Sequence, residues 1–383
     1  MTVSSELSHL PGYLETTPSI ALARLVSPEG SEVPAPGLTM PADADIRDLY
    51  RRLVVARRFD RQATLLARQG RLAVYPSASG QEACQVGAVA ALGPEDWMFP
   101  TYRETAALVT RGIPAVEALS LLRGERHCGY DPRRWRTAPQ CTPLATQALH
   151  AVGLAFAAKL EHDPVAVLTF LGDGATSEGD TGEALNCAAV YGAPVVFFIQ
   201  NNQYAISVPL AKQTRSPTLA HRALGYAVPG YRVDGNDVVA VKVLLAQLLD
   251  MAREGGGPAL VEAVTYRMEA HTNSDDPSRY RSPDEMAPWA HLDPVARVEA
   301  YLMKQGALDR QSADDIAAGA ESFAAAVREA LSGDMAVGPQ TLFSDVYRRP
   351  TPLLEAEAAM VAEELRLAGG GGGGSGAGGA GSP

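Results

Sequence analysis

Apolar runs and helical patterns alternate along most of the chain. Residues 164–170 and 194–199 are continuous apolar runs that predict buried strands, and the Ala-rich segment 181–191 between them predicts a helix. A strand–helix–strand unit of about 30 residues is the usual size for two parallel neighbours. Residues 46–70 have a helical pattern with arginines on one face. The opposite, apolar face is predicted to carry Leu49, Leu53, Val54, Leu65 and Leu66.

The same alternation continues toward the middle of the chain. Asp237 is a candidate N-cap for a helix over residues 238–253, and the three glycines 255–257 are a stop signal. Residues 258–264 then predict another strand. Strands that alternate with helices are typical of an α/β fold, so we expect a doubly wound, mostly parallel sheet.

Composition divides the chain into three parts. Residues 1–44 are rich in proline and predict an extended N-terminal arm, and residues 45–367 predict the α/β domain with C-terminal helices. Residues 368–383 are almost all Gly, Ala and Ser, which predicts a flexible tail without chemistry.

Charge and cysteine usage exclude several classes of protein. The net charge is −11, which argues against a nucleic-acid or anionic-membrane surface. No apolar run approaches the ~18–20 residues of a transmembrane helix. The four cysteines show neither zinc-site nor disulfide spacing, and no secretory signal is recognisable. We therefore expect a cytoplasmic protein with no membrane partner.

Two polar motifs follow the first two predicted strands. Gly172-Asp173-Gly174 ends the first, and Asn201-Asn202 ends the second. Parallel neighbours bring Asp173 and Asn202 together at the carboxyl edge of the sheet, where open α/β sheets bind ligands. A carboxylate and an amide oxygen are hard ligands that suit Mg²⁺, and glycines let backbone approach a diphosphate. The sequence thus predicts a site for a magnesium-bound diphosphate.

This motif pair resembles the thiamine-diphosphate-binding signature. Over roughly residues 46–347 the chain is also similar to the alpha subunit of the two-subunit first component of 2-oxo acid dehydrogenases. The blocks that carry this resemblance are residues 79–83, 102–104, 143–147, 172–180, 201–207, 233–237, 266–281 and 342–347.

The resemblance implies roles for individual residues. Asp173, the side chain of Asn202 and the main-chain carbonyl of Tyr204 would hold Mg²⁺. Tyr102 and Arg103 would reach the diphosphate, since the arginine fork bonds two phosphate oxygens at once. The remaining cofactor-binding candidates are Thr142 near the pyrimidine, Leu144 as an apolar prop, Gly174 and Ala175 through their backbone, Gln200, and Arg267.

The family's active-site histidine corresponds to His271, whose imidazole we expect to titrate near neutrality and pass a proton. Branched-chain relatives also have a potassium site, which would use Thr146, Gln147 and the carbonyl of Pro143 here. Cys141 replaces a serine hydroxyl of that site, and a thiol is a poor potassium ligand, so the sequence leaves K⁺ binding open.

The resemblance also implies partners. Such an alpha subunit works with a beta subunit, as two alpha and two beta chains, and passes an acyl group from a 2-oxo acid to a lipoyl acyltransferase. The blocks favour a branched-chain substrate, while residues 70–72, 79–83 and 275–277 also suit the alternative, a pyruvate or acetoin dehydrogenase alpha subunit. Two rarer alternatives are a complete single-chain thiamine enzyme and a catalytically silent scaffold subunit.

Overall fold

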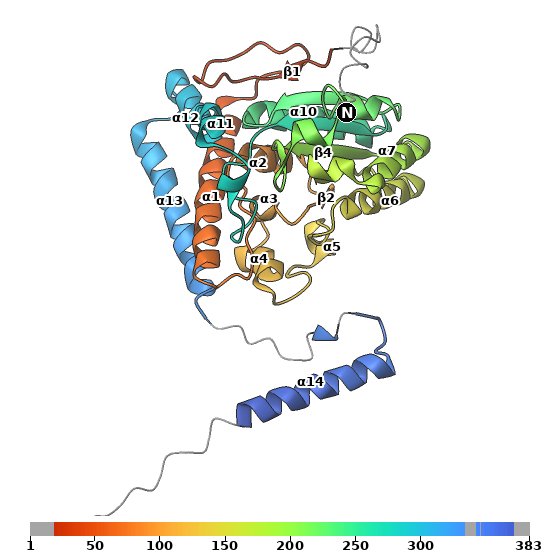
Figure 1. Ribbon diagram of the computed structural model, residues 1–383. Helices are drawn as coiled ribbons and strands as arrows, with labels where there is room; N and C mark the ends of the chain where they lie inside the picture. Colours follow the sequence, from red (N-terminus) through yellow and green to blue (C-terminus); the bar gives the residue numbers. More distant parts are fainter. Residues whose placement is uncertain (1–18, 334–341, 345, 371–383) are drawn as a thin grey trace, which may run out of the picture.

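Figure 1 shows the computed structural model, which describes residues 19–333, 342–344 and 346–370. Residues 1–18 of the predicted arm and residues 371–383 of the predicted tail lie outside the described residues, as does Asp345 in the 342–347 block. No helix in the described part of the chain has the length and apolar character needed to span a bilayer.

A six-stranded sheet forms the centre of the fold. Its strand order is β1-β7-β8-β4-β3-β2, and every neighbouring pair is parallel. The strands are β1 (Leu22–Ala23), β2 (Trp97–Phe99), β3 (Val167–Gly172), β4 (Val195–Asn201), β7 (Gly230–Asp234) and β8 (Ala259–Val264). A short antiparallel pair, β5 (Tyr204–Ala205) with β6 (Val208–Pro209), follows β4.

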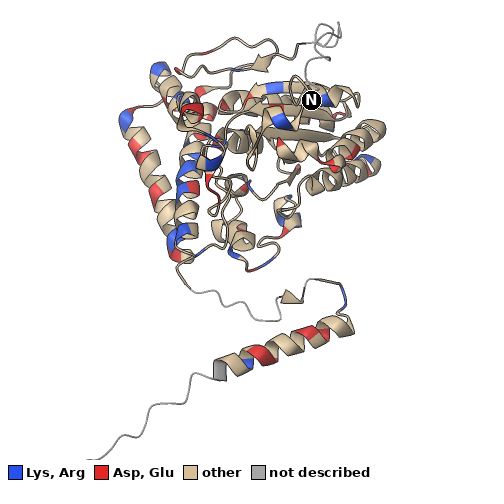
Figure 2. Ribbon diagram, in the orientation of Figure 1, with Lys and Arg blue, Asp and Glu red and all other residues tan. Residues whose placement is uncertain are grey.

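Helices connect the strands and fill the C-terminal part. They are α1 (Asp43–Arg68), α2 (Glu82–Ala91), α3 (Thr105–Thr110), α4 (Ala115–Arg123), α5 (Pro132–Trp135), α6 (Thr146–Glu161), α7 (Gly179–Tyr191), α8 (Leu210–Gln213), α9 (His221–Leu224), α10 (Val238–Arg253), α11 (Pro283–Ala290), α12 (Pro294–Gln305), α13 (Arg310–Ala330) and α14 (Pro352–Gly370), with 3₁₀ turns η2 (Gly174–Ser177) and η3 (Pro277–Arg279). Helix α14 lies apart from the body in Figure 1, and Figure 2 shows acidic residues along it.

Alternate residues of the central strands pack against opposite layers of helices. Leu168 and Phe170 of β3 belong to one apolar cluster, which includes α2 and α10. Val167 and Leu171 of the same strand belong to another, which includes α6 and α7. Because side chains alternate across a strand, helices cover both faces of the sheet. The predicted doubly wound, mostly parallel α/β fold is confirmed.

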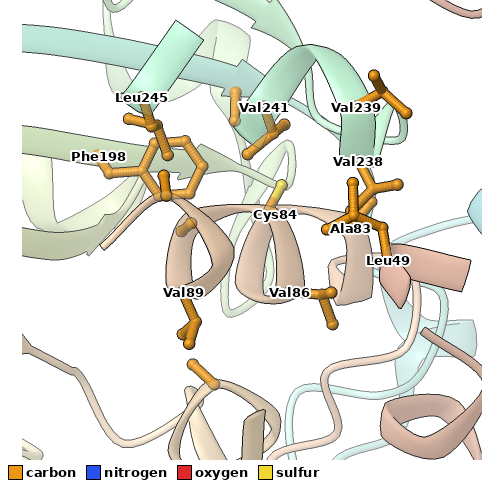
Figure 3. Packing of buried hydrophobic residues seen from close by; sticks show 14 of the residues in the cluster. Leu49, Ala83, Cys84, Val86, Val89, Phe198, Val238, Val239, Val241 and Leu245 are labelled. Carbon is orange, nitrogen blue, oxygen red and sulfur yellow. The ribbon is translucent and has the colours of Figure 1, made fainter. Parts of the chain in front are cut away.

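Helices α2 and α10 pack against each other in the layer that covers one face of the sheet. Figure 3 shows Cys84 of α2 pointing toward Val241 of α10, with Leu245 and Phe198 alongside. The Cys84 thiol donates a hydrogen bond to the carbonyl of Gly235 at 3.2 Å, and burial raises the pKa of this thiol. Cys84 is therefore a buried residue that packs in the core, and its thiol stays protonated.

The helix predicted over residues 46–70 is α1, which begins three residues earlier, at Asp43. Asp43 and Asp45 in its first turn complement the positive end of the helix dipole, which favours the earlier start. The expectation that Leu65 lies on the buried face is wrong, since this side chain is 45% exposed. Its neighbour Leu66 continues the stripe set by Phe59 and Ala63 and packs in the core.

The N-cap predicted at Asp237 is confirmed. One carboxylate oxygen accepts hydrogen bonds from the backbone of Val239 and Ala240 at the start of α10. The other accepts from the backbone of Leu25 and Val26 at 2.7 Å each. Asp237 thus also anchors Leu25 and Val26, which follow the edge strand β1 of the same sheet.

Candidate functional site

A cavity of about 690 Å³ lies at the carboxyl ends of β3 and β4. It gathers twelve predicted site residues from distant parts of the sequence. These are Tyr102, Arg103, Thr142, Leu144, Asp173, Gly174, Ala175, Gln200, Asn202, Tyr204, Arg267 and His271. A second cavity of about 990 Å³, lined in part by Thr181, Arg215 and Tyr226, contains none of the predicted site residues.

The pairing of β3 with β4 positions the predicted metal ligands. Gly172 lies opposite Gln200 in the parallel register, so Asp173 and Asn202 follow adjacent strand ends. Both side chains are buried, and burial raises the pKa of the Asp173 carboxyl. A buried carboxylate gains from a neighbouring cation, and the set of one carboxylate, one amide oxygen and one carbonyl suits Mg²⁺. The described residues contain no group of three or more His, Cys, Asp or Glu side chains that could hold a metal ion, so a metal at this position would depend on the amide and carbonyl oxygens as well as on Asp173.

The absence of a side chain has a different consequence at Gly172 than at Gly174. A Cβ at Gly172 would meet nothing within 4 Å, so this glycine leaves cavity space beside Asp173 open. A Cβ at Gly174 would come within 2.8 Å of the Ala205 Cβ. Gly174 is thus required for close packing of η2 against β5, in addition to any contact that its backbone makes with a ligand.

Two buried arginines give the cavity a positive wall. Arg103 donates to the carbonyl of Ser77 at 2.9 Å and to the carbonyl and Nδ1 of His271 at 3.1 and 3.0 Å. Arg267 donates to the carbonyl of Ile206 at 2.7 Å and to the Tyr280 hydroxyl at 3.0 Å. Neither has a carboxylate among these partners, and burial together with Arg103 lowers the pKa of Arg267. Such a pair fits an anionic diphosphate.

His271 is held as a neutral ring. Burial and the charges of Arg103 and Arg267 lower the pKa of His271 to about 3. The expectation that this imidazole titrates near neutrality is therefore wrong for the ligand-free protein. A guanidinium only donates hydrogen bonds, so the Nδ1 that faces Arg103 is the acceptor and the proton is on Nε2. His271 thus offers the cavity an N–H donor.

A carboxylate orders the loop that carries His271. Asp275 accepts hydrogen bonds from the backbone of His271 at 2.7 Å and from the Tyr280 hydroxyl at 2.5 Å. The Tyr102 ring meets the His271 ring edge-on, with ring centroids 6.1 Å apart. The loop is therefore linked to Arg103 through His271 and to Arg267 through Tyr280.

The remaining predicted cofactor residues line the cavity with different surroundings. Leu144 is 41% exposed, so its apolar side chain is free to contact a ligand or another chain. The Gln200 amide donates to Glu104 at 2.6 Å, while its own carbonyl oxygen is buried without a partner among the described residues. Glu104 is itself fully buried, and burial raises the pKa of its carboxyl.

Sequence reasoning gave no role to Gln81, Glu104 or Gln213, although all three line the cavity. Gln213 donates to the Asp173 carboxylate at 2.7 Å, and Gln81 accepts from the Asn202 amide at 3.0 Å. Gln81 and Glu104 lie inside blocks that resemble the family, and this was the only feature of the sequence that pointed to them as site residues. Gln213 is separated from Asp173 by 40 residues and no motif marks it.

The predicted potassium ligands lie outside this cavity, at the start of α6. Gln147 donates to the carbonyl of Phe170 at 2.7 Å, and in the part of the chain that the structure describes its own carbonyl oxygen is buried without a partner. The Cys141 thiol points to the carbonyl of Pro143 at 3.7 Å. The predicted potassium position thus offers carbonyl oxygens as ligands. The thiol of Cys141 donates to one of them, the carbonyl of Pro143.

The fold and the cavity define an α/β protein with a polar cavity at the carboxyl edge of a parallel sheet. Residues 50–334 match the family described as "Dehydrogenase E1 component", and the chain belongs to this family. It is 46% identical over 321 residues to the 3-methyl-2-oxobutanoate dehydrogenase subunit alpha of Mycobacterium tuberculosis (84% of this chain, 87% of the relative). It is 38% identical over 290 residues to the pyruvate dehydrogenase E1 component subunit alpha of Staphylococcus aureus (75% and 78%). The resemblance seen in the sequence is confirmed.

Proposed function

We propose that this chain is the alpha subunit of a branched-chain 2-oxo acid dehydrogenase. With its beta subunit it would oxidatively decarboxylate the 2-oxo acid and transfer the acyl group to a lipoyl acyltransferase. The observation that carries the proposal is one cavity lined both by the proposed metal ligands Asp173 and Asn202 and by Arg103 and Arg267, two buried arginines whose hydrogen-bond partners among the described residues include no carboxylate. The E1 family membership and the 46% identity to a branched-chain alpha subunit support the same substrate class.

The residues of the cavity fit thiamine diphosphate with Mg²⁺. Asp173, Asn202 and the Tyr204 carbonyl would hold the metal. Arg103 and Arg267 would bind the diphosphate, with Tyr102, Gly174, Ala175 and Gln200 around it and Thr142 and Leu144 along the cofactor's other end. Bound thiamine diphosphate supplies a carbanion and accepts the electrons left when carbon dioxide departs. Through its Nε2–H, His271 would donate a hydrogen bond to substrate oxygen.

A beta subunit would complete the site. Three apolar side chains that line the cavity, Leu144, Ile206 and Val208, are 41%, 56% and 42% exposed. Exposed apolar groups around a ligand cavity indicate that another surface covers them. We propose an assembly of two alpha and two beta chains in the cytoplasm, with cofactor at each interface. K⁺ at Pro143, Thr146 and Gln147 would be an additional ligand of the alpha chain.

The requirement for the beta subunit gives a direct test. We expect the purified chain alone to show less than about 1% of the 2-oxo acid decarboxylation of the alpha–beta complex, since the beta subunit would complete the cofactor site and the loss of one positioned proton-transfer group costs about 10²- to 10⁴-fold. An artificial electron acceptor would report the rate without the acyltransferase. Full activity of the lone chain would favour a complete single-chain thiamine enzyme, and an inactive complex that binds cofactor would favour a silent scaffold.

Substrate preference distinguishes the branched-chain proposal from its main alternative. We expect kcat/KM of the complex for 4-methyl-2-oxopentanoate to exceed that for pyruvate by at least about 10-fold. Each additional buried methylene contributes about 0.8 kcal/mol, and a branched side chain has several of these groups. Steady-state rates with both substrates at one pH make the comparison. A higher value for pyruvate would assign the chain to the pyruvate type.

A further inference from the structure

One proposed metal ligand, Asn202, donates a hydrogen bond to Gln81, a residue to which the sequence analysis gave no role. Gln81 is 1% exposed, precedes α2 as its N-cap residue, and lines the cavity. Its Oε1 accepts a hydrogen bond from Nδ2 of Asn202 at 3.0 Å. The Oδ1 of Asn202 faces the other way and accepts from the backbone N–H of Tyr204 at 3.2 Å. Gln81 thus fixes the orientation of the Asn202 amide, with Nδ2 toward Gln81 and Oδ1 toward the backbone N–H of Tyr204.

The orientation of this amide matters because only its oxygen can bind a cation. If Gln81 presented its NH₂ group to Asn202, the favourable contact would require Asn202 to turn its oxygen toward Gln81. The NH₂ of Asn202 would then face the metal position, where an N–H group repels a cation. A ligand's outer hydrogen-bond partner therefore decides whether the ligand is correctly presented.

The second end of Gln81 has no partner in the described residues. Its Nε2 is buried and makes no hydrogen bond. An unsatisfied buried donor costs free energy, and an anion in the cavity would satisfy it. The cavity is already lined by Arg103 and Arg267, which have no carboxylate partner among the described residues and would attract an anion. The oxygen of the Gln81 amide thus accepts a hydrogen bond from the proposed metal ligand Asn202, and its nitrogen is available to donate to a phosphate.

We propose that Gln81 couples metal binding to diphosphate binding. Its Oε1 orients Asn202 for the metal, and its Nε2 donates to a phosphate oxygen of the cofactor. The diphosphate fixes the Gln81 amide in the orientation that keeps the Asn202 oxygen toward the cation. Gln81 is therefore a positioning residue for the metal and a contact residue for the anion. This inference rests on the proposed thiamine diphosphate site.

Two substitutions separate these roles in the alpha–beta complex. Gln81→Met keeps the length of the side chain and removes both polar groups. Gln81→Glu keeps an oxygen acceptor for Asn202 and removes the donor to phosphate. Gln62→Met is the matched control, because Gln62 is also buried, at 2% exposed, and bonds Arg58 on α1, outside the cavity. Thermal melting by circular dichroism verifies that each complex is folded.

Binding would be measured without turnover. Mn²⁺ is the metal probe, followed by its paramagnetic resonance signal at saturating thiamine diphosphate, and calorimetry gives cofactor affinity at saturating Mn²⁺. We expect Gln81→Met to weaken Mn²⁺ binding about 10- to 100-fold and to weaken cofactor binding as well. Gln81→Glu should restore Mn²⁺ affinity to within about 3-fold of the wild type while cofactor affinity stays at least about 10-fold weaker.

The outcomes distinguish this inference from the proposed function. If Gln81→Met binds Mn²⁺ and cofactor as the Gln62→Met control does, the role of Gln81 is wrong while the thiamine diphosphate site stands. Equal weakening of Mn²⁺ binding by Gln81→Met and Gln81→Glu would overturn the acceptor role. A wild-type complex that binds neither Mn²⁺ nor thiamine diphosphate would overturn the proposed function and this inference with it.

Discussion

Replacing Asp173 by alanine is expected to abolish metal-dependent binding of thiamine diphosphate to the alpha–beta complex. Asp173 is the one charged member of the proposed metal-ligand set, and it is 1% exposed. Without it, an amide oxygen and a main-chain carbonyl would have to hold a divalent ion with no negative charge. Changes in outer-shell partners alone cost 10- to 100-fold in metal affinity, so losing this ligand should cost more than about 100-fold. Titration of cofactor and Mg²⁺ by calorimetry measures the effect.

A nearby aspartate provides the control. Asp180 lies exposed at the start of α7, only seven positions along the chain, and does not line the cavity. Asp180→Ala should give the wild-type isotherm. Gln213 loses its 2.7 Å carboxylate partner in Asp173→Ala, so a melting curve must accompany the isotherm to show that the variant is folded. An unchanged isotherm for a folded Asp173→Ala complex would remove Asp173 from the metal site.

The β3–α7–β4 unit shows what the sequence could predict. Two buried parallel strands have almost uninterrupted apolar runs, and the helix between them is the crossover that a parallel pair needs. Once the strands are parallel neighbours, the residues just after them must lie together. Asp173 and Asn202 therefore follow from local pattern and connectivity. The cap at Asp237 was equally local, because an N-cap acts on backbone within three residues of itself.

Other features depend on contacts that no local pattern contains. Strand β1 has two residues, and its pairing with β7 joins Leu22 to Arg232. Glu104 and Gln200 are 96 residues apart, and Gln81 and Asn202 are 121 apart. The shift in the pKa of His271 likewise arises first from burial and then from the charges of Arg103, which is distant in sequence, and Arg267. Family blocks located these residues, but their partners and ionisation are set by packing.

The second large effect is expected at Arg103. We expect Arg103→Met to weaken thiamine diphosphate binding to the alpha–beta complex by about 100-fold at pH 7.5. Two hydrogen bonds to a charged phosphate are together worth about 3 kcal/mol, and each 1.4 kcal/mol is tenfold. The same substitution removes the bonds that hold Ser77 and His271, so the loop that carries His271 also loses an anchor. Arg133→Met, at an exposed arginine on α5, is the control.

The pH dependence of this loss tests the origin of the neutral histidine. In the wild type, the pKa of His271 is lowered to about 3, so the ring stays uncharged from pH 7.5 to 5 and does not change cofactor affinity. Burial is the largest cause of this shift and Arg267 is another, so removing the Arg103 charge should raise the pKa only part of the way toward its ordinary value of about 6.5. As the pH falls from 7.5 to 5, a growing fraction of the variant's His271 would gain a positive charge that attracts the diphosphate. The affinity deficit of Arg103→Met should therefore narrow toward pH 5, measured by calorimetry at each pH against the wild type. Arg103→Met combined with His271→Gln should show a constant deficit, and a deficit of Arg103→Met alone that is independent of pH would mean that Arg103 does not control the ionisation of His271.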